Sequence, residues 1–500
     1  MSDHALRLLR ETPHLAELAA FPFNFDLDRA RHVEEVRLAS GGPLEPVAGD
    51  DTGGTYFVCA DGSVLYADSE GSAGIIGNSV DEAMEMMIGL PGWHDHLDLA
   101  PGDGPEAILA TVAETEEEMR ECYGIDAERA ELRAALDLPE RSPVELVGML
   151  HAALLRTEPG FLLLNTEEGG AYALLDGHPR TPLWDTVLER GRADLALLRQ
   201  GTSWDEVATD RVRRALALRA AQYDRQDTDL PLLRHLLAHE AEASTTDELR
   251  LAAVLVGLHG LAEDLPLLHT VRETTYDTWC GLGGIPEAGA SGEELREWAR
   301  GLDDSFLGTD PRDAPESTWT RLAREQGLDE LARVALIRRL DDVDRRAYAQ
   351  RPAGSDASDM HGLAHAFMDL GDTFQALRAQ RLFTALQNTG RGRVSALLTL
   401  SRLERESGRP REAARTLARL RQTLTAGPGT PGGGRADAPD ESLKHWRDTN
   451  LGVFVVDEHH EVARAAAADP GLPEETREVT EAAAVLLSEL SEAARRSVRR

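Results

Sequence analysis

The sequence predicts an α+β head over residues 1–140, a small antiparallel sheet with helices, followed by a mainly α body in which helix pairs repeat as a solenoid. The chain is therefore expected to be predominantly α overall. Two strand-like segments flank a turn near residue 61, and two different sequence patterns recur after 35 and 37 residues. A chain of 500 residues also exceeds what one hydrophobic core normally supports, so several domains are expected.

The sheet of the head is predicted from two short segments. Residues 55–60 and 63–67 are rich in β-branched and aromatic side chains, and Asp61-Gly62 between them suits a two-residue hairpin turn. Ser79 stands where an N-cap is expected, which predicts a helix up to residue 90. Further helices are expected over 5–20, 104–122 and 126–138.

A connector over residues 141–190 is predicted to join the head to the body. Ser142-Pro143 is typical of a helix start, because proline is favoured in the first turn. Residues 160–165 and 171–175 flank a Glu-Glu-Gly-Gly sequence, which predicts a second β-hairpin.

The first repeat has an offset of 35 residues. The sequence Asp-Leu-Pro-Leu-Leu at 229–233 recurs at 264–268, and the apolar positions of the preceding helix recur with it. Each aspartate is expected to cap the second helix of a pair, with proline in its first turn. The pattern resembles HEAT-type repeats, and this resemblance implies a helical array over 191–345, with an imperfect unit at 317–340 and an insertion at 276–292.

The second repeat has an offset of 37 residues. Leu370-Gly371-Asp372 is echoed by Ser407-Gly408-Arg409, and an alanine-containing helix follows each glycine. The pattern resembles tetratricopeptide-type repeats, which implies helix pairs over 356–425. A Gly/Pro linker is predicted over 426–441 and a helical cap over 442–500. Within this cap, residues 452–456 are either a strand or a buried helical turn, and the final helix is expected over 474–496.

Acidic charge is concentrated in the first part of the chain. Residues 1–140 carry 30 acidic and 8 basic side chains, and no lysine or arginine stands between Arg37 and Arg120. Either this excess only serves solubility, or it forms a surface that steers a basic protein partner. Binding of nucleic acid by the head is disfavoured, because like charges would repel. Residues 378–421 are instead rich in arginine, and this segment could dock the head, bind an acidic partner or simply be exposed.

Composition argues against several kinds of chemistry. The chain has one lysine, Lys444, and it does not follow a glycine, so neither a phosphate-binding loop nor a catalytic lysine is expected. Three cysteines without Cys-x-x-Cys spacing suggest reduced thiols and a cytoplasmic location. No signal peptide is expected, and no apolar run reaches the roughly 18 residues that would cross a membrane. The sequence indicates no cofactor.

Histidines are the remaining candidates for chemistry. His94 and His96 lie on either side of Asp95, next to Trp93, and could bind a metal together with a distant carboxylate. The alternative is an ordinary place in the core. Two further pairs have the i,i+4 spacing of metal ligands but lack the glutamate that follows the first histidine in zinc proteases, namely His235 with His239 and His361 with His365.

The turn and strand sequences of the head resemble the SUKH superfamily. The resemblance is carried by Gly-Gly-Thr-Tyr-Phe-Val at 53–58, Asp-Gly-Ser-Val-Leu-Tyr at 61–66, Asp-Ser-Glu-Gly at 68–71 and the helix that follows. That superfamily includes Smi/Knr-type regulators and many bacterial immunity proteins that neutralise toxins. The resemblance implies a head that binds another protein beside its sheet.

The leading hypothesis is a non-enzymatic protein that neutralises a basic protein partner by covering it, as an immunity factor does. The expected partner-binding residues are acidic side chains of the head and the neighbouring tryptophan, namely Asp61, Asp68, Glu70, Trp93, Asp95 and Asp98. The alternatives are a metal-dependent hydrolase that uses His94 and His96, and a scaffold protein with several partners.

Overall fold

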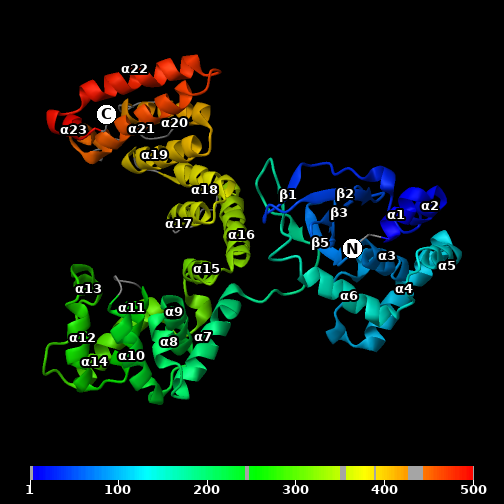
Figure 1. Cartoon of the computed structure of the whole chain (residues 1–500), viewed down its shortest axis with the longest axis horizontal. Coiled ribbons are helices and arrows are strands. Elements are labelled where there is room, and N and C mark those ends of the chain that lie inside the picture. Colours follow the sequence, from blue (N-terminus) through cyan, green and yellow to red (C-terminus); the bar gives the residue numbers. More distant parts are fainter. Residues whose placement is uncertain (1–3, 243–246, 350–355, 388–389, 426–442, 499–500) are drawn as a thin grey trace.

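The structure is a computed structural model that describes residues 4–242, 247–349, 356–387, 390–425 and 443–498. It has the predicted fold class, with an α+β head followed by helices (Figure 1). The predicted linker over 426–441 lies outside the described residues. Among the described helices, none is both long enough and apolar enough to cross a membrane.

The head is organised around a five-stranded sheet with the strand order β2-β3-β4-β5-β7. The first four strands pair antiparallel, and β7 is added parallel to β5. The predicted hairpin is confirmed, since Thr55 of β3 lies opposite Ala67 of β4, and Gly62 in the turn has a φ of +90°. The strands are β1 (Val36–Leu38), β2 (Leu44–Gly49), β3 (Thr55–Cys59), β4 (Val64–Ala67), β5 (Ser72–Gly77), β6 (Leu163–Asn165) and β7 (Ala173–Leu174).

Six helices belong to the head. The predicted cap of α3 is confirmed, because the Ser79 hydroxyl accepts a hydrogen bond of 3.1 Å from the backbone N–H of Glu82. The single helix expected over 5–20 is instead two helices, because Thr12 is extended and Pro13 starts a new helix. The helices are α1 (His4–Glu11), α2 (Pro13–Ala20), α3 (Val80–Gly89), α4 (Pro105–Tyr123), α5 (Asp126–Ala135) and α6 (Pro143–Leu155).

The head extends to about residue 176, so residues 141–176 are part of it and not a separate connector. Helix α6 contributes Leu146, Leu150 and Leu154 to the main core of the head. The hairpin expected over 160–175 forms only near its turn, where the Leu163 carbonyl accepts from the Tyr172 N–H at 2.9 Å. The two segments, 160–165 and 171–175, do not form a longer ladder with each other, because β6 pairs with β1 and β7 pairs with β5.

The predicted 35-residue offset is present in the order of the helices, since α10 follows α9 as α12 follows α11. In packing, α9 lies mainly against α7, and α11 lies against α10 and α14. The repeated aspartates are buried, but they do not cap α10 and α12 with their side chains as expected. Asp229 accepts from Arg199 at 2.8 Å and Asp264 from Arg234 at 2.5 Å, so each repeated aspartate instead pairs with an arginine of a preceding helix. The helices are α7 (Leu183–Arg199), α8 (Trp204–Thr209), α9 (Arg211–Tyr223), α10 (Leu230–Glu240), α11 (Asp247–Leu258), α12 (Leu265–Arg272), α13 (Tyr276–Gly281), α14 (Gly292–Leu302), α15 (Glu316–Glu325) and α16 (Asp329–Tyr348).

The 37-residue repeat also corresponds to two helix pairs, α17 with α18 and α19 with α20. Gly371 and Gly408 lie between the helices of each pair with φ values of +69° and +71°, a conformation that glycine adopts without strain. Residues 452–456 are helical, which settles the alternative left open by the sequence, and the helix expected over 474–496 is divided at Leu490. The helices are α17 (Asp356–Asp369), α18 (Thr373–Leu386), α19 (Gly390–Glu406), α20 (Pro410–Thr425), α21 (Asn450–Ala467), α22 (Pro473–Glu489) and α23 (Glu492–Ser497).

The head is held against the middle of the body, at α16 and α18 (Figure 1). Arg338 of α16 donates to Glu158 at 2.7 Å and to the Tyr172 carbonyl at 2.8 Å. The Gly169 carbonyl accepts from Gln375 at 2.8 Å and from Arg378 at 2.9 Å. The first arginine of the Arg-rich segment therefore contacts the head, and the contact is with a backbone carbonyl and not with the acidic side chains of the head.

Candidate functional site

Several connections of the head meet at one end of the five-stranded sheet. Gly49 lies opposite Thr55, and Ala67 lies opposite both Thr55 and Ala73, so the turns 50–54 and 68–71 emerge side by side. The Ser69 hydroxyl donates to the Thr52 carbonyl at 3.2 Å, which joins the two turns. The segment before β7 emerges at the same end, because Ala173 lies opposite Ser72.

Seven carboxylates lie on these connections and on the segment before β1, which is joined to them by the hydrogen bond from the Thr166 N–H to the Glu35 carbonyl, and we call them the acidic loop end. Six are exposed and one, Asp68, is half-buried. Among the described residues, none of the seven makes an ion pair with an arginine or a histidine. They are Glu34, Glu35, Asp51, Asp68, Glu70, Glu167 and Glu168.

Buried Asp50 fixes the turn that carries Asp51. Its carboxylate accepts hydrogen bonds from the Tyr66 hydroxyl at 2.6 Å, from the Gly54 N–H at 2.8 Å, and from the N–H and hydroxyl of Thr52 at 2.9 Å. Burial acts to raise the pKa of Asp50, but these donors outweigh it and hold the pKa below the ordinary value. Asp50 is thus ionised and fully hydrogen-bonded at neutral pH, and its role is to shape the turn.

A second hydrogen-bond network fixes Glu34. The Tyr172 hydroxyl donates to Glu34 at 2.5 Å, and Nε2 of His32 lies 3.0 Å from the same hydroxyl oxygen. Because that hydroxyl has a single proton, Nε2 carries the proton that it shares with Tyr172. Nδ1 of His32 then accepts from the Thr55 hydroxyl at 3.1 Å. Burial lowers the pKa of His32, while Glu34 and Asp68 act to raise it, so the ring is neutral at pH 7.

Two groups of the head, Tyr172 at this end of the sheet and Cys59 at the opposite end, are poorly suited to act as nucleophiles. Burial and the hydrogen bond to Glu34 raise the pKa of Tyr172 well above its ordinary value. Burial raises the pKa of Cys59 to about 12, with Asp61 acting in the same direction. Both groups stay protonated at neutral pH, whereas a nucleophile needs a lowered pKa or an adjacent base. The arrangement is better suited to attracting cations.

The predicted partner-binding residues do not form one surface. Asp68 and Glu70 belong to the acidic loop end. Asp61 lies in the β3–β4 turn at the opposite end of the sheet, where it forms an ion pair of 3.1 Å with Arg156. Asp61 therefore does not share a surface with Asp68 and Glu70, since successive turns of an antiparallel sheet emerge at opposite ends.

The segment around Trp93 also differs from the prediction. Trp93 is only 2% exposed and packs in the main core, with its ring centroid 5.2 Å from that of Tyr66, so it is not available to a partner. Asp95 and Asp98 are exposed, but Asp98 accepts from the Gly177 N–H at 3.0 Å and so holds the chain after β7.

His94 and His96 lie in different surroundings, and among the described residues neither belongs to a group of three or more possible metal ligands. The His94 ring stacks on Trp93 with ring centroids 3.7 Å apart, and the carboxylates that act on it are chiefly those of Asp50 and Asp95. His96 is buried in different surroundings, where Asp95 and Glu116 act on it. Burial lowers the pKa of both rings. Both therefore fit a place in the core.

The other histidine pairs are neighbours along helices. The rings of His235 and His239 have centroids 4.6 Å apart, as do those of His361 and His365. In each pair the second ring bonds to the backbone carbonyl of the first residue. Within the described part of the chain, no group of three or more His, Cys, Asp or Glu side chains is placed to hold a metal ion.

Sequence reasoning missed more than half of the acidic loop end. Glu34 and Glu35 precede β1, and Glu167 and Glu168 come about 90 positions after the end of β5 and just before β7. They meet because the Thr166 N–H donates to the Glu35 carbonyl at 2.9 Å. The Glu-Glu-Gly-Gly turn was visible in the sequence, but the pairing of β6 with β1 that places it was not.

Comparisons of the chain with protein-family models, with curated proteins and with solved structures found no match.

Proposed function

We propose that this chain is a non-catalytic protein-binding protein that holds a basic partner against the acidic loop end of its head. The observation that carries the proposal is the set of seven carboxylates on adjoining connections, none of them in an ion pair among the described residues. Unpaired charges of one sign raise the rate at which an oppositely charged protein docks, and they disfavour acidic partners.

The surroundings of this surface support the same proposal. Asp50 and the His32–Tyr172–Glu34 network hold the turns in place, so little ordering would be needed on binding. The resemblance of residues 53–71 to the SUKH superfamily adds a class of partner, a toxin that the chain would neutralise by covering its basic surface. Free cysteines at 59, 122 and 280 fit a reducing compartment such as the cytoplasm.

The test compares two full-length variants of equal net charge. The first changes Asp51 to Asn and Glu70, Glu167 and Glu168 to Gln, and it spares Asp68 because that side chain accepts from the Glu70 and Ser72 N–H groups of its turn. The control changes four exposed glutamates of α4 that make no ion pair with the described residues, namely Glu106, Glu114, Glu118 and Glu121, to Gln.

Proteins captured from host extract by the unchanged chain are then titrated with each variant by calorimetry. A docked partner should bind with a one-to-one stoichiometry, and the first variant should lose about 1–4 kcal/mol, from up to about 1 kcal/mol per rim charge. The control should bind as the unchanged chain does. Affinity should also fall between about 0.1 and 1 M salt, because the Debye length shrinks from about 10 to 3 Å. Equal losses in both variants, or a complex indifferent to salt, would refute the proposal.

A further inference from the structure

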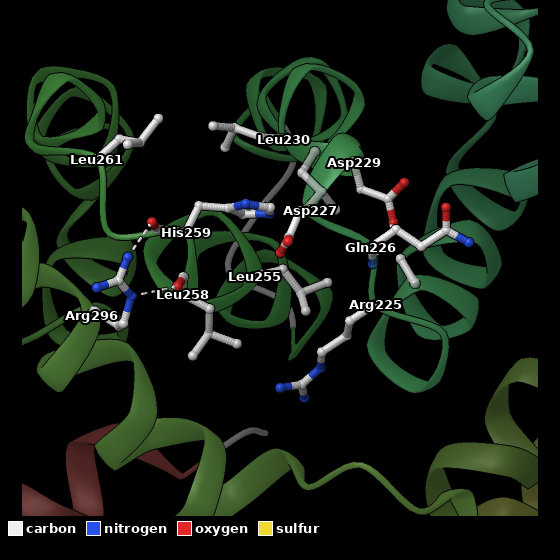
Figure 2. Close-up of a pocket in the computed structure, with 12 residues that line it drawn as sticks. Arg225, Gln226, Asp227, Asp229, Leu230, Leu255, Leu258, His259, Leu261 and Arg296 are labelled. Atoms are coloured by element: carbon white, nitrogen blue, oxygen red, sulfur yellow. Dashed lines mark hydrogen bonds between the residues drawn. The ribbon is translucent and has the colours of Figure 1, made fainter.

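The repeats of the body enclose a cleft of about 540 Å³, far along the chain from the acidic loop end. One wall is the loop between α9 and α10, which includes the short helix η4 (Asp227–Asp229), and the other is the end of α11 with the loop after it. The cleft thus lies where the equivalent loops of two successive repeats stack (Figure 2). Five leucines line it, namely Leu230, Leu233, Leu255, Leu258 and Leu261.

Most charges at the rim of the cleft are already neutralised. Arg225 forms a two-pronged ion pair with Asp303, at 2.6 and 2.7 Å. Asp229 is bound by Arg199 at 2.8 Å. Arg296 donates to the Leu258 and His259 carbonyls and pairs with Glu293 at 2.8 Å.

In the cleft, the side chains of Asp227 and His259 have no hydrogen bond or ion pair to the described residues. Figure 2 shows the His259 ring and the Asp227 carboxylate directed toward each other in the middle of the cleft, with Leu230 on one side and Leu255 on the other. Burial lowers the pKa of His259, although Asp227, Asp229 and Asp264 act to raise it. A neutral ring leaves the negative charge of Asp227 uncompensated within the cleft.

We propose that this cleft binds a polypeptide segment of a partner protein, with an aliphatic side chain inserted among the leucines and a lysine or arginine next to it placed against Asp227. The volume is within the usual range of about 300–1,000 Å³ for binding pockets, and an apolar lining with a few polar groups is their usual composition. We expect the occupant to be cationic, because the exposed Asp227 carboxylate has no ion-pair partner among the described residues. The neutral His259 ring supplies one donor and one acceptor for the backbone of the segment.

This inference rests on the proposed function only in that the chain binds proteins, and it requires no contact with the head. It is tested on the full chain with two short probe peptides, one in which photo-leucine alternates with lysine and one in which photo-leucine alternates with glutamate. Irradiation joins the photo-leucine to its neighbours, and digestion with mass spectrometry locates the cross-links.

The lysine-containing peptide should cross-link within 225–233 and 255–261, and the glutamate-containing peptide should not. Asp227→Asn should weaken this cross-linking by about tenfold, which corresponds to about 1.4 kcal/mol for one lost charge-assisted contact. The matched control is Asp277→Asn, which removes another exposed aspartate from the first turn of a short helix and should change nothing. Leu261→Ser should also weaken cross-linking, and it is a safe change because Leu261 is 41% exposed.

Three outcomes would overturn the inference: equal labelling by both peptides, labelling confined to the head, or an Asp227→Asn variant that behaves as the unchanged chain does. The variant neutralised at Asp51, Glu70, Glu167 and Glu168 separates the two proposals. It should retain the cross-links in the body even if the proposal for the head fails.

Discussion

The hydrogen bond between Tyr66 and Asp50 should control the stability of the turn that carries the acidic loop end. Tyr66→Phe removes one of the donors to Asp50 and leaves the ring in place. Asp50 is 3% exposed, so water cannot replace the lost donor without opening the turn. A hydrogen bond to a charged group contributes about 1.5–3 kcal/mol, and we expect a loss of that size.

Native-state hydrogen exchange read by mass spectrometry is the appropriate assay, because a chain of several domains does not unfold in a single transition. The free energy of opening at the amides of β3 and β4 should fall by about 1.5–3 kcal/mol, while that of α19 and α20 should not change. Tyr56→Phe is the matched control. Tyr56 is a buried tyrosine of the neighbouring strand whose hydroxyl has no hydrogen-bond partner among the described residues.

Comparing Tyr66→Phe with Tyr56→Phe shows whether the hydrogen bond to Asp50 stabilises the turn. Removing an unpartnered buried hydroxyl should have little effect or should stabilise the sheet slightly. If Tyr66→Phe and Tyr56→Phe change exchange equally, the turn does not depend on Asp50, and the account of how the acidic loop end is shaped is wrong.

Three further perturbations test other parts of the structure. The pKa of Asp50 is lower in the folded head than its unfolded value of about 3.9, so its contribution to stability is full above pH 4 and is lost as the pH falls through the folded pKa. Hydrogen exchange measured at a series of pH values should show this loss of stability in the unchanged chain and not in Asp50→Asn. Glu248→Gln should lower the free energy of opening at the amides of α9 and α11 by about 3 kcal/mol in hydrogen exchange, since it leaves two arginines facing a neutral amide in a mostly buried site. In Gly191→Ala of α7 the added methyl group would collide with the Leu216 carbonyl oxygen, so a lowered melting temperature is expected. Gly148→Ala of α6 meets nothing within 4 Å and should stabilise its helix by up to about 1 kcal/mol.

Local sequence patterns predicted those elements whose neighbours are close in the chain. The Asp61-Gly62 turn, the Ser79 cap and the paired helices around Gly371 and Gly408 all depend on contacts within a few residues. Such contacts are specified by side-chain preferences and by glycine, which a sequence displays directly.

Contacts between distant segments were not predictable in the same way. Aspartate is a residue type that often caps helices, but the Asp229 carboxylate instead accepts a hydrogen bond from Arg199, which is 30 positions earlier in the chain. The arms of the 160–175 segment match a hairpin, yet each pairs with an edge strand of the head. In both cases a contact with a distant segment replaces the contact that local sequence preference favours, and the sequence alone does not show which of the two forms.

The sequence predicted that the candidate site consists of carboxylates, but it did not predict most of the residues that form it. The stretch without lysine or arginine pointed to carboxylates of the head, and Asp68 and Glu70 lie where carboxylates gather. Asp61 and Trp93 lie apart from this surface, because the sequence does not reveal at which end of a sheet a turn lies or how deeply a tryptophan is buried.

The docking of the head on the middle of the body has a consequence for synthesis of the chain. Leu162 and Leu164 of the head are buried against side chains of α16 and α17. The Gly169 carbonyl accepts hydrogen bonds from Gln375 and Arg378, which are synthesised later. When the ribosome has finished the head near residue 176, about 200 residues are still to be made before that contact exists, which takes roughly 10–40 s at about 5–20 residues per second. During that interval an apolar edge of the nascent head stays uncovered, and this is where a chaperone would be expected to bind.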